Sequence, residues 1–346
     1  VFTVAPGEAA FILEGMEGRI LVTGASGFVG GAVCRALSAR GYAVRGTGRR
    51  SRPQGFPEGE EYVSVDLNDQ VALRPLCEGV RAVVHVAAKA GVWGPREEYF
   101  RANVSATEGL LSEARRAGVK AFVFTSTPSV VFNGEAIRGG DESLPYGSDY
   151  PCFYPETKAE AERMVLAADG EGMRTLALRP HLIWGPGDPH LFPRVFERVD
   201  AGRLKIVGEG KNRVDLTYIE NVVAGHVAAL ESLLAGKGGG RAYFLTQDEP
   251  VELWPFVNRV LVATGRKAVE KKVSLRLAFI AGRICEGVWT TFRLRGEPPM
   301  TRFVAQELAK DHWFTSASAR EVLGYRPVVS MDEGLERYLE SLRDEG

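Results

Sequence analysis

The stretch RILVTGASGFVG, residues 19–30, decides how this chain of 346 residues folds. Its first five residues form a short apolar run, which predicts a buried parallel strand. Gly24, Gly27 and Gly30 follow at three-residue intervals, and helical spacing continues over 30–40. Such a turn lets the backbone approach a pyrophosphate, and the helix N-terminus supplies free N–H groups. We therefore predict a dinucleotide-binding βαβ unit; a purely structural turn is the alternative.

Strand and helix patterns alternate through the first half of the chain. Five further apolar runs predict buried strands, at 42–46, 62–65, 82–86, 121–124 and 175–178. Helical spacing separates them, for example over 103–117, and a later helix is expected over 221–234. This alternation indicates βαβ units. We expect an α/β fold: a Rossmann-type doubly wound parallel sheet with a smaller C-terminal substrate domain.

Breaks in the pattern suggest the domain boundaries. A Gly/Pro run at 185–189 interrupts the alternation, and glycines at 236–240 predict a loop. Residues before Met16 are apolar but lack the basic residues of a signal peptide, so we interpret them as an upstream extension. The assignment is an N-terminal extension at 1–15, an NADP-binding Rossmann domain at 16–184 to which 213–235 returns, and a substrate domain at 185–212 and 236–346.

Composition and charge exclude several classes of protein. The 43 basic and 44 acidic side chains nearly balance, so no electrostatic footprint for nucleic acid is present. Four cysteines and five histidines show none of the close spacings of metal sites, so we expect no metal. No apolar run is long enough to cross a membrane. We expect a cytoplasmic protein with reduced thiols.

The end of the second predicted strand bears on the choice of cofactor. An NAD site places a carboxylate there for the ribose 2′-hydroxyl, whereas a 2′-phosphate favours arginine. The run VRGTGRRSR, residues 44–52, holds Arg49 and Arg50, and no acid occurs before Glu58. NADP(H) is therefore the preferred cofactor and NAD(H) the alternative, unless this is only a solvated basic loop. Asp66-Leu67, after the third strand, is a candidate contact for the adenine.

One tyrosine–lysine pair has the spacing of two side chains that cooperate in proton transfer. Tyr154 and Lys158 form the only Y-x-x-x-K of the chain, and on a helix both lie on one face. An ammonium beside a phenol favours the phenolate, so we expect Lys158 to lower the pKa of Tyr154. A proton donor near working pH is what the interconversion of an alcohol and a ketone requires. Hydroxyl side chains at 125–129 end the fifth strand.

With these motifs in this order, the chain from Arg19 to Leu342 resembles an extended short-chain dehydrogenase/reductase. The resemblance implies a catalytic triad of Thr127, Tyr154 and Lys158, with Ser126 as the alternative hydroxyl. It also implies cofactor contacts at Gly24, Ser26, Gly27, Phe28, Val29, Gly30, Ala87, Ala88, Lys89, Asn103, Tyr154, Lys158, Pro180, Leu182 and Ile183.

Four longer strings resemble one branch of that family, the 3β-hydroxysteroid and sterol-4-carboxylate dehydrogenases, and in it the bacterial 2-alkyl-3-ketoacid reductases. The strings are AAKAGVWG at 87–94, TSTPSV at 125–130, IWGPGD at 183–188 and LRGEPPMTRF at 294–303. The branch implies hydride transfer between NADP(H) and C3 of an apolar 2-alkyl-3-keto acid or 3β-hydroxysteroid. A nucleotide-sugar epimerase is the rival enzyme, and a cofactor-binding regulator the non-enzymatic one.

The partners expected are an apolar small molecule and a second copy of the chain in a homodimer. The segment 274–295 predicts an amphipathic helix. It is interpreted either as packing within the domain or a dimer, or as a lid or a peripheral contact with a membrane or another enzyme. Lys89 and Arg194 are candidates to pair with a substrate carboxylate. Trp93 and Trp184 suit either the core or the pocket.

Overall fold

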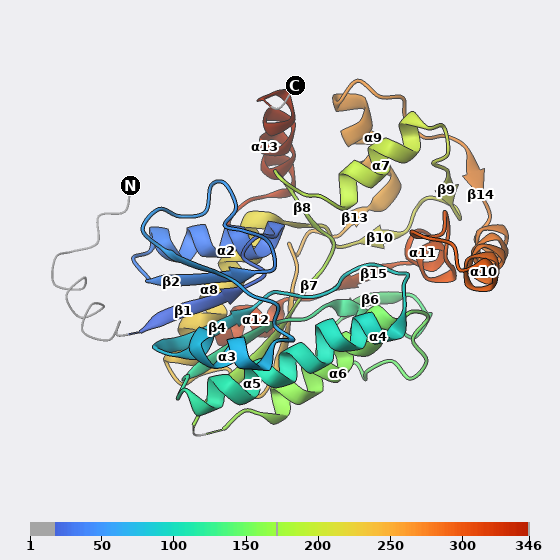
Figure 1. The fold of residues 1–346 in the computed structure, drawn as a ribbon. Coiled ribbons are helices and arrows are strands. Elements are labelled where there is room, and N and C mark those ends of the chain that lie inside the picture. The colour runs from blue at the N-terminus through green and yellow to red at the C-terminus, as the bar shows by residue number, and fades with distance from the viewer. Residues whose placement is uncertain (1–17, 171, 345–346) are drawn as a thin grey trace.

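A computed structural model describes residues 18–170 and 172–344, so the proposed extension at 1–15 lies outside the described residues. Its centre is a seven-stranded parallel sheet with strand order β12-β7-β5-β4-β1-β2-β3 (Figure 1). The strands are β1 (Arg19–Thr23), β2 (Val44–Gly48), β3 (Glu61–Ser64), β4 (Val80–His85), β5 (Ala121–Thr125), β7 (Arg174–Pro180) and β12 (Ala242–Leu245). The order reverses between β1 and β4, and ligands of such sheets bind at the carboxyl ends beside this point.

Helices cover both faces of the sheet, because successive strand residues point to opposite sides. Ile20 and Val22 of β1 join the apolar cluster under α2 and α8, and Leu21 joins the cluster under α3 and α5. The covering helices are α2 (Phe28–Ala39), α3 (Gln70–Cys77), α5 (Ala106–Arg116), α6 (Phe153–Ala167), α8 (Ile219–Leu234) and α12 (Ala317–Leu323). The expected doubly wound Rossmann-type fold is therefore confirmed.

Most of the remaining elements build a smaller region beside the carboxyl edge of the sheet (Figure 1). A second sheet runs β13 (Val251–Glu252), β10 (Arg213–Val214), β15 (His312–Phe314) and β6 (Ile137–Gly140). Two strand pairs are β8 (Ile183–Trp184) with β11 (Thr217–Tyr218), and β9 (Ile206–Val207) with β14 (Lys272–Val273). The helices of this region are α7 (Leu191–Asp200), α9 (Leu253–Ala263), α10 (Leu275–Phe292), α11 (Arg302–Glu307) and α13 (Met331–Asp344). By contrast, α4 (Arg96–Tyr99) and η1 (Phe100–Ser105) lead directly into α5, and both pack against α6, as does η2 (Pro128–Val131).

Several boundaries differ from those read off the sequence. β12 pairs with β7 in the large sheet, although 236–346 was assigned to the substrate domain. Its residues Tyr243, Phe244 and Leu245 are fully buried, and a buried run is stable only when its backbone pairs with a neighbouring strand. The helix expected over 103–117 begins in η1, a π-helical segment that precedes α5.

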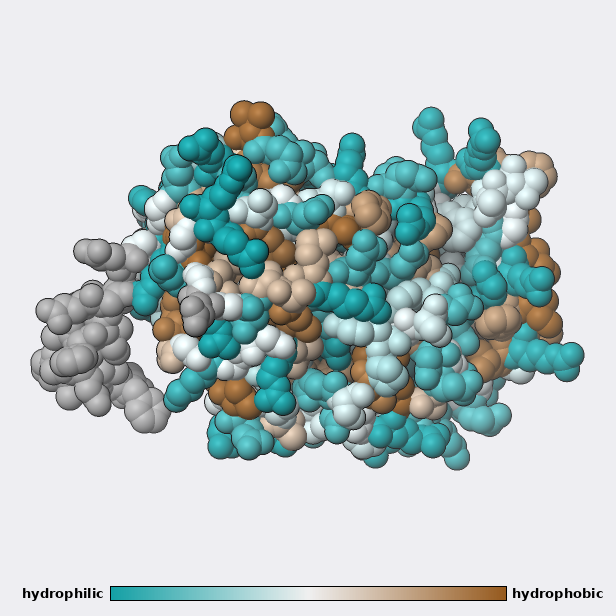
Figure 2. Space-filling view, turned by 90° about the horizontal axis from the view of Figure 1, so that it is seen from below, coloured by the Kyte–Doolittle hydropathy of each residue, from teal (hydrophilic) through white to brown (hydrophobic). Residues whose placement is uncertain are grey.

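The helix expected over 274–295 is present as α10. Its exposed side chains include Leu277, Ile280, Ile284 and Phe292. Brown, apolar surface gathers at the end of the molecule that carries α10 (Figure 2). In the described part of the chain, no helix combines the length and apolar character that a membrane crossing needs.

Candidate active site

The glycine-rich turn after β1 brings the backbone close enough to hold a pyrophosphate. Gly24 has φ +68°, and a Cβ on it would stand 3.0 Å from the backbone nitrogen of Ala87. A Cβ on Gly30 would stand 2.3 Å from the carbonyl oxygen of Gly24. Gly27 donates to that same oxygen at 2.8 Å and is the N-cap of α2. A Cβ at Gly24 or Gly30 would crowd the neighbouring backbone, so only glycine allows this close turn, and such a turn fits a dinucleotide.

Two arginines follow β2, where the cofactor ribose of such folds lies. Arg50 donates through Nη2 to the carbonyl oxygen of Ser26, 2.7 Å away in the glycine turn. Hydrogen bonds from Asn68 lower the pKa of Asp66, and the exposed guanidinium of Arg49 lowers it further. The predicted adenine contact at Asp66 is therefore an ionised carboxylate at pH 7. Its neighbour Leu67 is buried against the core under α3.

A buried chain of hydroxyls and an imidazole fixes the loop after β4. Thr107 donates to the carbonyl oxygen of Asn103 at 2.7 Å, so its oxygen accepts from Nε2 of His85 at 2.9 Å. The Nδ1 atom of His85 then accepts from the hydroxyl of Thr23 at 2.7 Å. The oxygen of Thr23 accepts from the backbone nitrogen of Ala87 at 3.0 Å. Burial lowers the pKa of His85 to about 3, which keeps the imidazole neutral.

Sequence reasoning missed Thr23, His85 and Thr107. Thr23 and His85 end apolar runs, and Thr107 lies on an ordinary helix face. The one signal in the sequence was a polar residue within a strand predicted to be fully buried. All three are fully buried in the structure.

Asn103 connects the loop after β4 to helix α6. Its Oδ1 accepts from the backbone nitrogen of Lys89 at 2.7 Å, and its Nδ2 donates to the carbonyl oxygen of Lys89 at 3.1 Å. The same Nδ2 donates to Oγ1 of Thr157 at 3.0 Å. Asn103 lies in the π-helix η1, a form that is frequent at functional sites. It is therefore a positioning residue for α6 and for the backbone at 87–89.

Helix α6 presents Tyr154 to the hydroxyl of Thr127. The Thr127 side chain hydrogen-bonds the phenol, which favours the phenolate, but burial outweighs it and raises the pKa of Tyr154 to about 12. The oxygen of Thr127 also accepts from the backbone nitrogen of Ser129 at 3.2 Å and is thereby oriented. The alternative hydroxyl, Ser126 Oγ, is buried and has no partner in the described residues. Thr127 is therefore the hydroxyl that the structure places beside Tyr154.

Lys158 follows one turn later, and its contacts differ from those expected. Its Nζ donates to the carbonyl oxygen of Thr125 at 2.6 Å and lies 3.9 Å from the ring centroid of Phe124. Burial lowers the pKa of Lys158 to about 7, while Glu162 opposes the shift. The expected lowering of the Tyr154 pKa by Lys158 is wrong for this arrangement. Lys158 is buried and Tyr154 half-buried, and desolvation disfavours the charged form of each.

The segment after β7 carries the remaining predicted cofactor contacts, Pro180, Leu182 and Ile183. Leu182 has φ +36°, an uncommon conformation for a branched side chain. Thr217 holds this turn because its backbone nitrogen donates to the carbonyl oxygens of His181 and Leu182, each at 3.2 Å. Strained backbone that its surroundings hold in place is concentrated at ligand sites.

The side chains considered for the substrate have partners within the chain. Nζ of Lys89 lies 2.8 Å from Oε2 of Glu98, and Nη1 of Arg194 lies 3.2 Å from Oε2 of Glu297. A substrate carboxylate would therefore have to displace a side chain that is already bound. Trp184 is fully buried among aromatic rings and belongs to the core.

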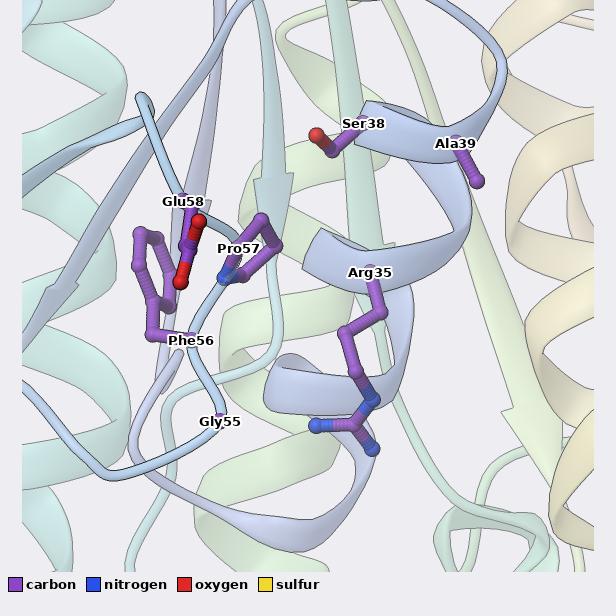
Figure 3. Close-up of a pocket in the computed structure, with 7 residues that line it drawn as sticks. All are labelled: Arg35, Ser38, Ala39, Gly55, Phe56, Pro57 and Glu58. Carbon is purple, nitrogen blue, oxygen red and sulfur yellow. The ribbon is translucent and has the colours of Figure 1, made fainter.

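Figure 3 shows a pocket of about 500 Å³ between α2 and the loop after β2. Its lining residues are Arg35, Ser38, Ala39, Gly55, Phe56, Pro57 and Glu58. None of them is a predicted site residue. The candidate active site is instead defined by the carboxyl ends of β1, β4, β5 and β7. There the structure brings together the glycine turn, the backbone at 87–89, Thr127 and helix α6.

Comparison with known proteins identifies the family of the chain. The model of the 3-beta hydroxysteroid dehydrogenase/isomerase family matches residues 21–277. The chain belongs to this family of extended short-chain dehydrogenases/reductases, and it is an oxidoreductase that acts on CH–OH groups with a nicotinamide cofactor.

Two curated relatives and one solved structure illustrate the range of similar proteins. A 2-alkyl-3-oxoalkanoate reductase of Stenotrophomonas maltophilia is 44% identical over 322 residues, 92% of this chain and 98% of the relative. The human sterol-4-alpha-carboxylate 3-dehydrogenase, decarboxylating, is 34% identical over 332 residues, 94% of this chain and 88% of the relative. MoeE5 in complex with UDP-glucose and NAD superposes with a TM-score of 0.73 at 26% identity, covering 95% of this chain and 99% of MoeE5.

Proposed function

We propose that this enzyme interconverts a ketone and a secondary alcohol at C3 of an apolar 2-alkyl-3-oxo acid, with NADP(H) as cofactor. The observation that carries the proposal is the phenol of Tyr154 hydrogen-bonded to Thr127 at the end of β5. The 44% identity to a 2-alkyl-3-oxoalkanoate reductase over nearly its full length supports this substrate class. The 3β-hydroxysteroid class is the alternative, which a 36% identical 3-beta-hydroxysteroid dehydrogenase of Mycolicibacterium neoaurum keeps open.

The chain's own groups supply the proton and the orientation. With a pKa of about 12, Tyr154 is protonated at pH 7 and donates to the carbonyl oxygen of the substrate. Thr127 hydrogen-bonds the same oxygen and holds it beside the phenol. When bound, the nicotinamide supplies or accepts the hydride at its C4. Lys158, one helical turn after Tyr154 and with a pKa of about 7, would restore the proton to Tyr154.

The residues after β2 support NADP(H). Arg49 and Arg50 stand where a 2′-phosphate requires positive charge, and no carboxylate in 44–52 offers a partner for a free 2′-hydroxyl. We place Arg49 at the phosphate and Arg50 as its neighbour, tied to the glycine turn through Ser26. Solved structures of similar fold contain NAD, so NAD(H) is the alternative that titration must exclude.

The test is oxidation of two alcohols, followed by nicotinamide absorbance. One is a long-chain 2-alkyl-3-hydroxy acid with NADP, and the other a 3β-hydroxysteroid with NADP and with NAD. Turnover of the alkyl acid alone is the expected result. Turnover of the steroid alone would overturn the substrate class. No turnover of either, with cofactor bound, would favour the nucleotide-sugar epimerase, whose signature is co-purified NAD without net oxidation.

The exposed apolar side chains of α10 favour binding of a lipid surface or a second copy of the chain, outside the active site. Leu277, Ile280 and Ile284 are 60%, 44% and 61% exposed, and Arg276 and Arg283 lie beside them on the helix. Exposed apolar side chains flanked by cations suit a lipid surface, whereas a homodimer would cover them with the same face of a second copy. Sedimentation velocity, with and without anionic vesicles, separates the two; a monomer that ignores vesicles contradicts both.

A further inference from the structure

Two histidines far apart in the sequence lie side by side in the smaller region. His181 follows β7 and His312 opens β15, and their ring centroids are 4.9 Å apart at an interplanar angle of 81°. The residues are 6% and 5% exposed. Neither Nδ1 atom has a hydrogen-bond partner among residues 18–170 and 172–344. A buried nitrogen without a partner loses the hydrogen bond that water would give it, so it needs an explanation.

The other histidines show that this is not a general property of the fold. Both ring nitrogens of His85 are hydrogen-bonded, to Thr23 and Thr107. Both ring nitrogens of His226 are hydrogen-bonded as well, through Nε2 to the hydroxyl of Thr125 and through Nδ1 to the backbone of Val222. His190 is exposed to solvent. In the described part of the chain, His181 and His312 are therefore the two buried histidines that each have a ring nitrogen without a hydrogen-bond partner.

The remaining contacts of the pair give each imidazole a fixed tautomer. Nε2 of His312 donates to the backbone carbonyl of Glu307 at 2.8 Å, which leaves Nδ1 with a lone pair. The imidazole of His181 bonds the backbone of Asp215, and burial keeps the pKa of His181 well below its ordinary value. An imidazole that gives one N–H to a backbone carbonyl and keeps a lone pair on its other nitrogen is the form in which histidine binds metal ions.

Glu307, the last residue of α11, completes the set. One possible ligand atom from each of His181, Glu307 and His312 lies within 4.8 Å of the others. The side chain of Glu307 is 20% exposed, so the cluster is accessible from solvent on the side of Glu307. We propose that these three residues bind a divalent transition-metal ion such as Zn²⁺. Two imidazole nitrogens and one carboxylate form an established zinc ligand set, with water in the fourth position.

The position of this site suggests what the ion does. His181 lies between Pro180 and Leu182, in the segment predicted to contact the nicotinamide, whereas Glu307 and His312 belong to the smaller region. An ion held by all three would tie the end of β7 to α11 and β15. It would therefore restrict the movement of the two parts against each other and raise the melting temperature, without taking part in hydride transfer.

The test is titration of the untagged, metal-stripped full chain with Co²⁺, followed by visible absorption, and with Zn²⁺ in competition. We expect one saturable site per chain that Zn²⁺ displaces. His312→Ala and Glu307→Gln should each weaken binding by at least about tenfold, with His190→Ala as the matched control that leaves it unchanged. Glu307 is partly exposed, so Glu307→Gln tests the site even if a histidine variant fails to fold.

Three results would overturn the proposal. They are the absence of saturable binding, binding that survives Glu307→Gln and His312→Ala at full affinity, and a thiolate-to-cobalt charge-transfer band. That band would place the ion on a cysteine. Zn²⁺ should also raise the melting temperature of the wild type and leave that of Glu307→Gln unchanged, a readout that is independent of whether the proposed substrate is correct.

Discussion

The ammonium of Lys158 is directed at the backbone carbonyl of Thr125, with Nζ and the oxygen 2.6 Å apart. This bond joins the middle of α6 to the carboxyl end of β5, the strand whose extension carries Thr127. The lysine is 2% exposed, and the acid one turn further along the helix, Glu162, is engaged by Arg179 at 2.5 Å. Lys158 therefore connects the helix to the sheet and is available for proton exchange near neutral pH.

Replacement of Tyr154 should separate chemistry from binding. Tyr154→Phe removes the proton donor and keeps the ring, so turnover should fall by at least about 100-fold, within the range typical of a general acid. The affinity for NADPH, measured by fluorescence titration, should change little. Tyr150→Phe is the matched control, because the phenol of Tyr150 donates to the backbone carbonyl of Val130 and lies outside the Thr127–Tyr154 pair. Retained activity in Tyr154→Phe would refute the mechanism.

Burial of Lys158 should make stability depend on pH. Its pKa falls from 10.5 to about 7 on folding, so the unfolded chain binds more protons between these values. Stability should therefore rise as the pH increases from 7 towards 10.5, with a slope of at most about 1.4 kcal/mol per pH unit from this group. Urea unfolding at several pH values should show a smaller rise for Lys158→Met. Equal slopes in both proteins would contradict the lowered pKa.

Asn103 should affect both stability and turnover. Asn103→Leu removes the hydrogen bonds to the half-buried backbone of Lys89 and the bond donated to the hydroxyl of Thr157, which should cost about 2 kcal/mol of unfolding free energy. Because the same bonds position α6, kcat should fall together with the stability. Asn103→Asp keeps the acceptor for the Lys89 backbone and should lose less. If Asn103→Leu kept the kcat and the urea midpoint of the wild type, Asn103 would not position α6 or the backbone of Lys89.

Charge reversal at Arg49 should change the choice of cofactor. In Arg49→Glu the new carboxylate repels a 2′-phosphate and accepts from a free 2′-hydroxyl, so the ratio of kcat/KM for NADP over NAD should fall by about tenfold or more. Arg40→Glu, at another exposed arginine that follows α2, is the control for net charge. An unchanged ratio would remove Arg49 from the cofactor site.

Local patterns allowed much of the fold and part of the site to be predicted. The strand at 19–23 has the bounds that the structure shows, because an apolar run between a glycine and a glycine turn leaves little choice. Gly24, Gly27 and Gly30 were identifiable because their role depends on backbone geometry over a few residues. The same holds for Tyr154 and Lys158, since a spacing of four on a helix fixes one shared face.

Long-range contacts were not predictable in this way. The direction of the Lys158 side chain depends on where β5 ends, and the network of His85 depends on three segments that meet only in the folded sheet. The seventh strand, β12, lies 62 residues after the end of β7, its neighbour in the sheet, so sequence distance conceals the pairing.

The sequence by itself determined the strand–helix alternation, the glycine cradle and the tyrosine–lysine pair, because each is encoded within a few neighbouring residues. Only the tertiary structure decided the environments of these groups. It desolvated Tyr154 and Lys158 and so shifted both pKa values toward the neutral forms. It also placed His181 beside His312, 131 positions away in the chain. Desolvation and side-chain proximity arise from packing between distant segments, and no local pattern specifies them.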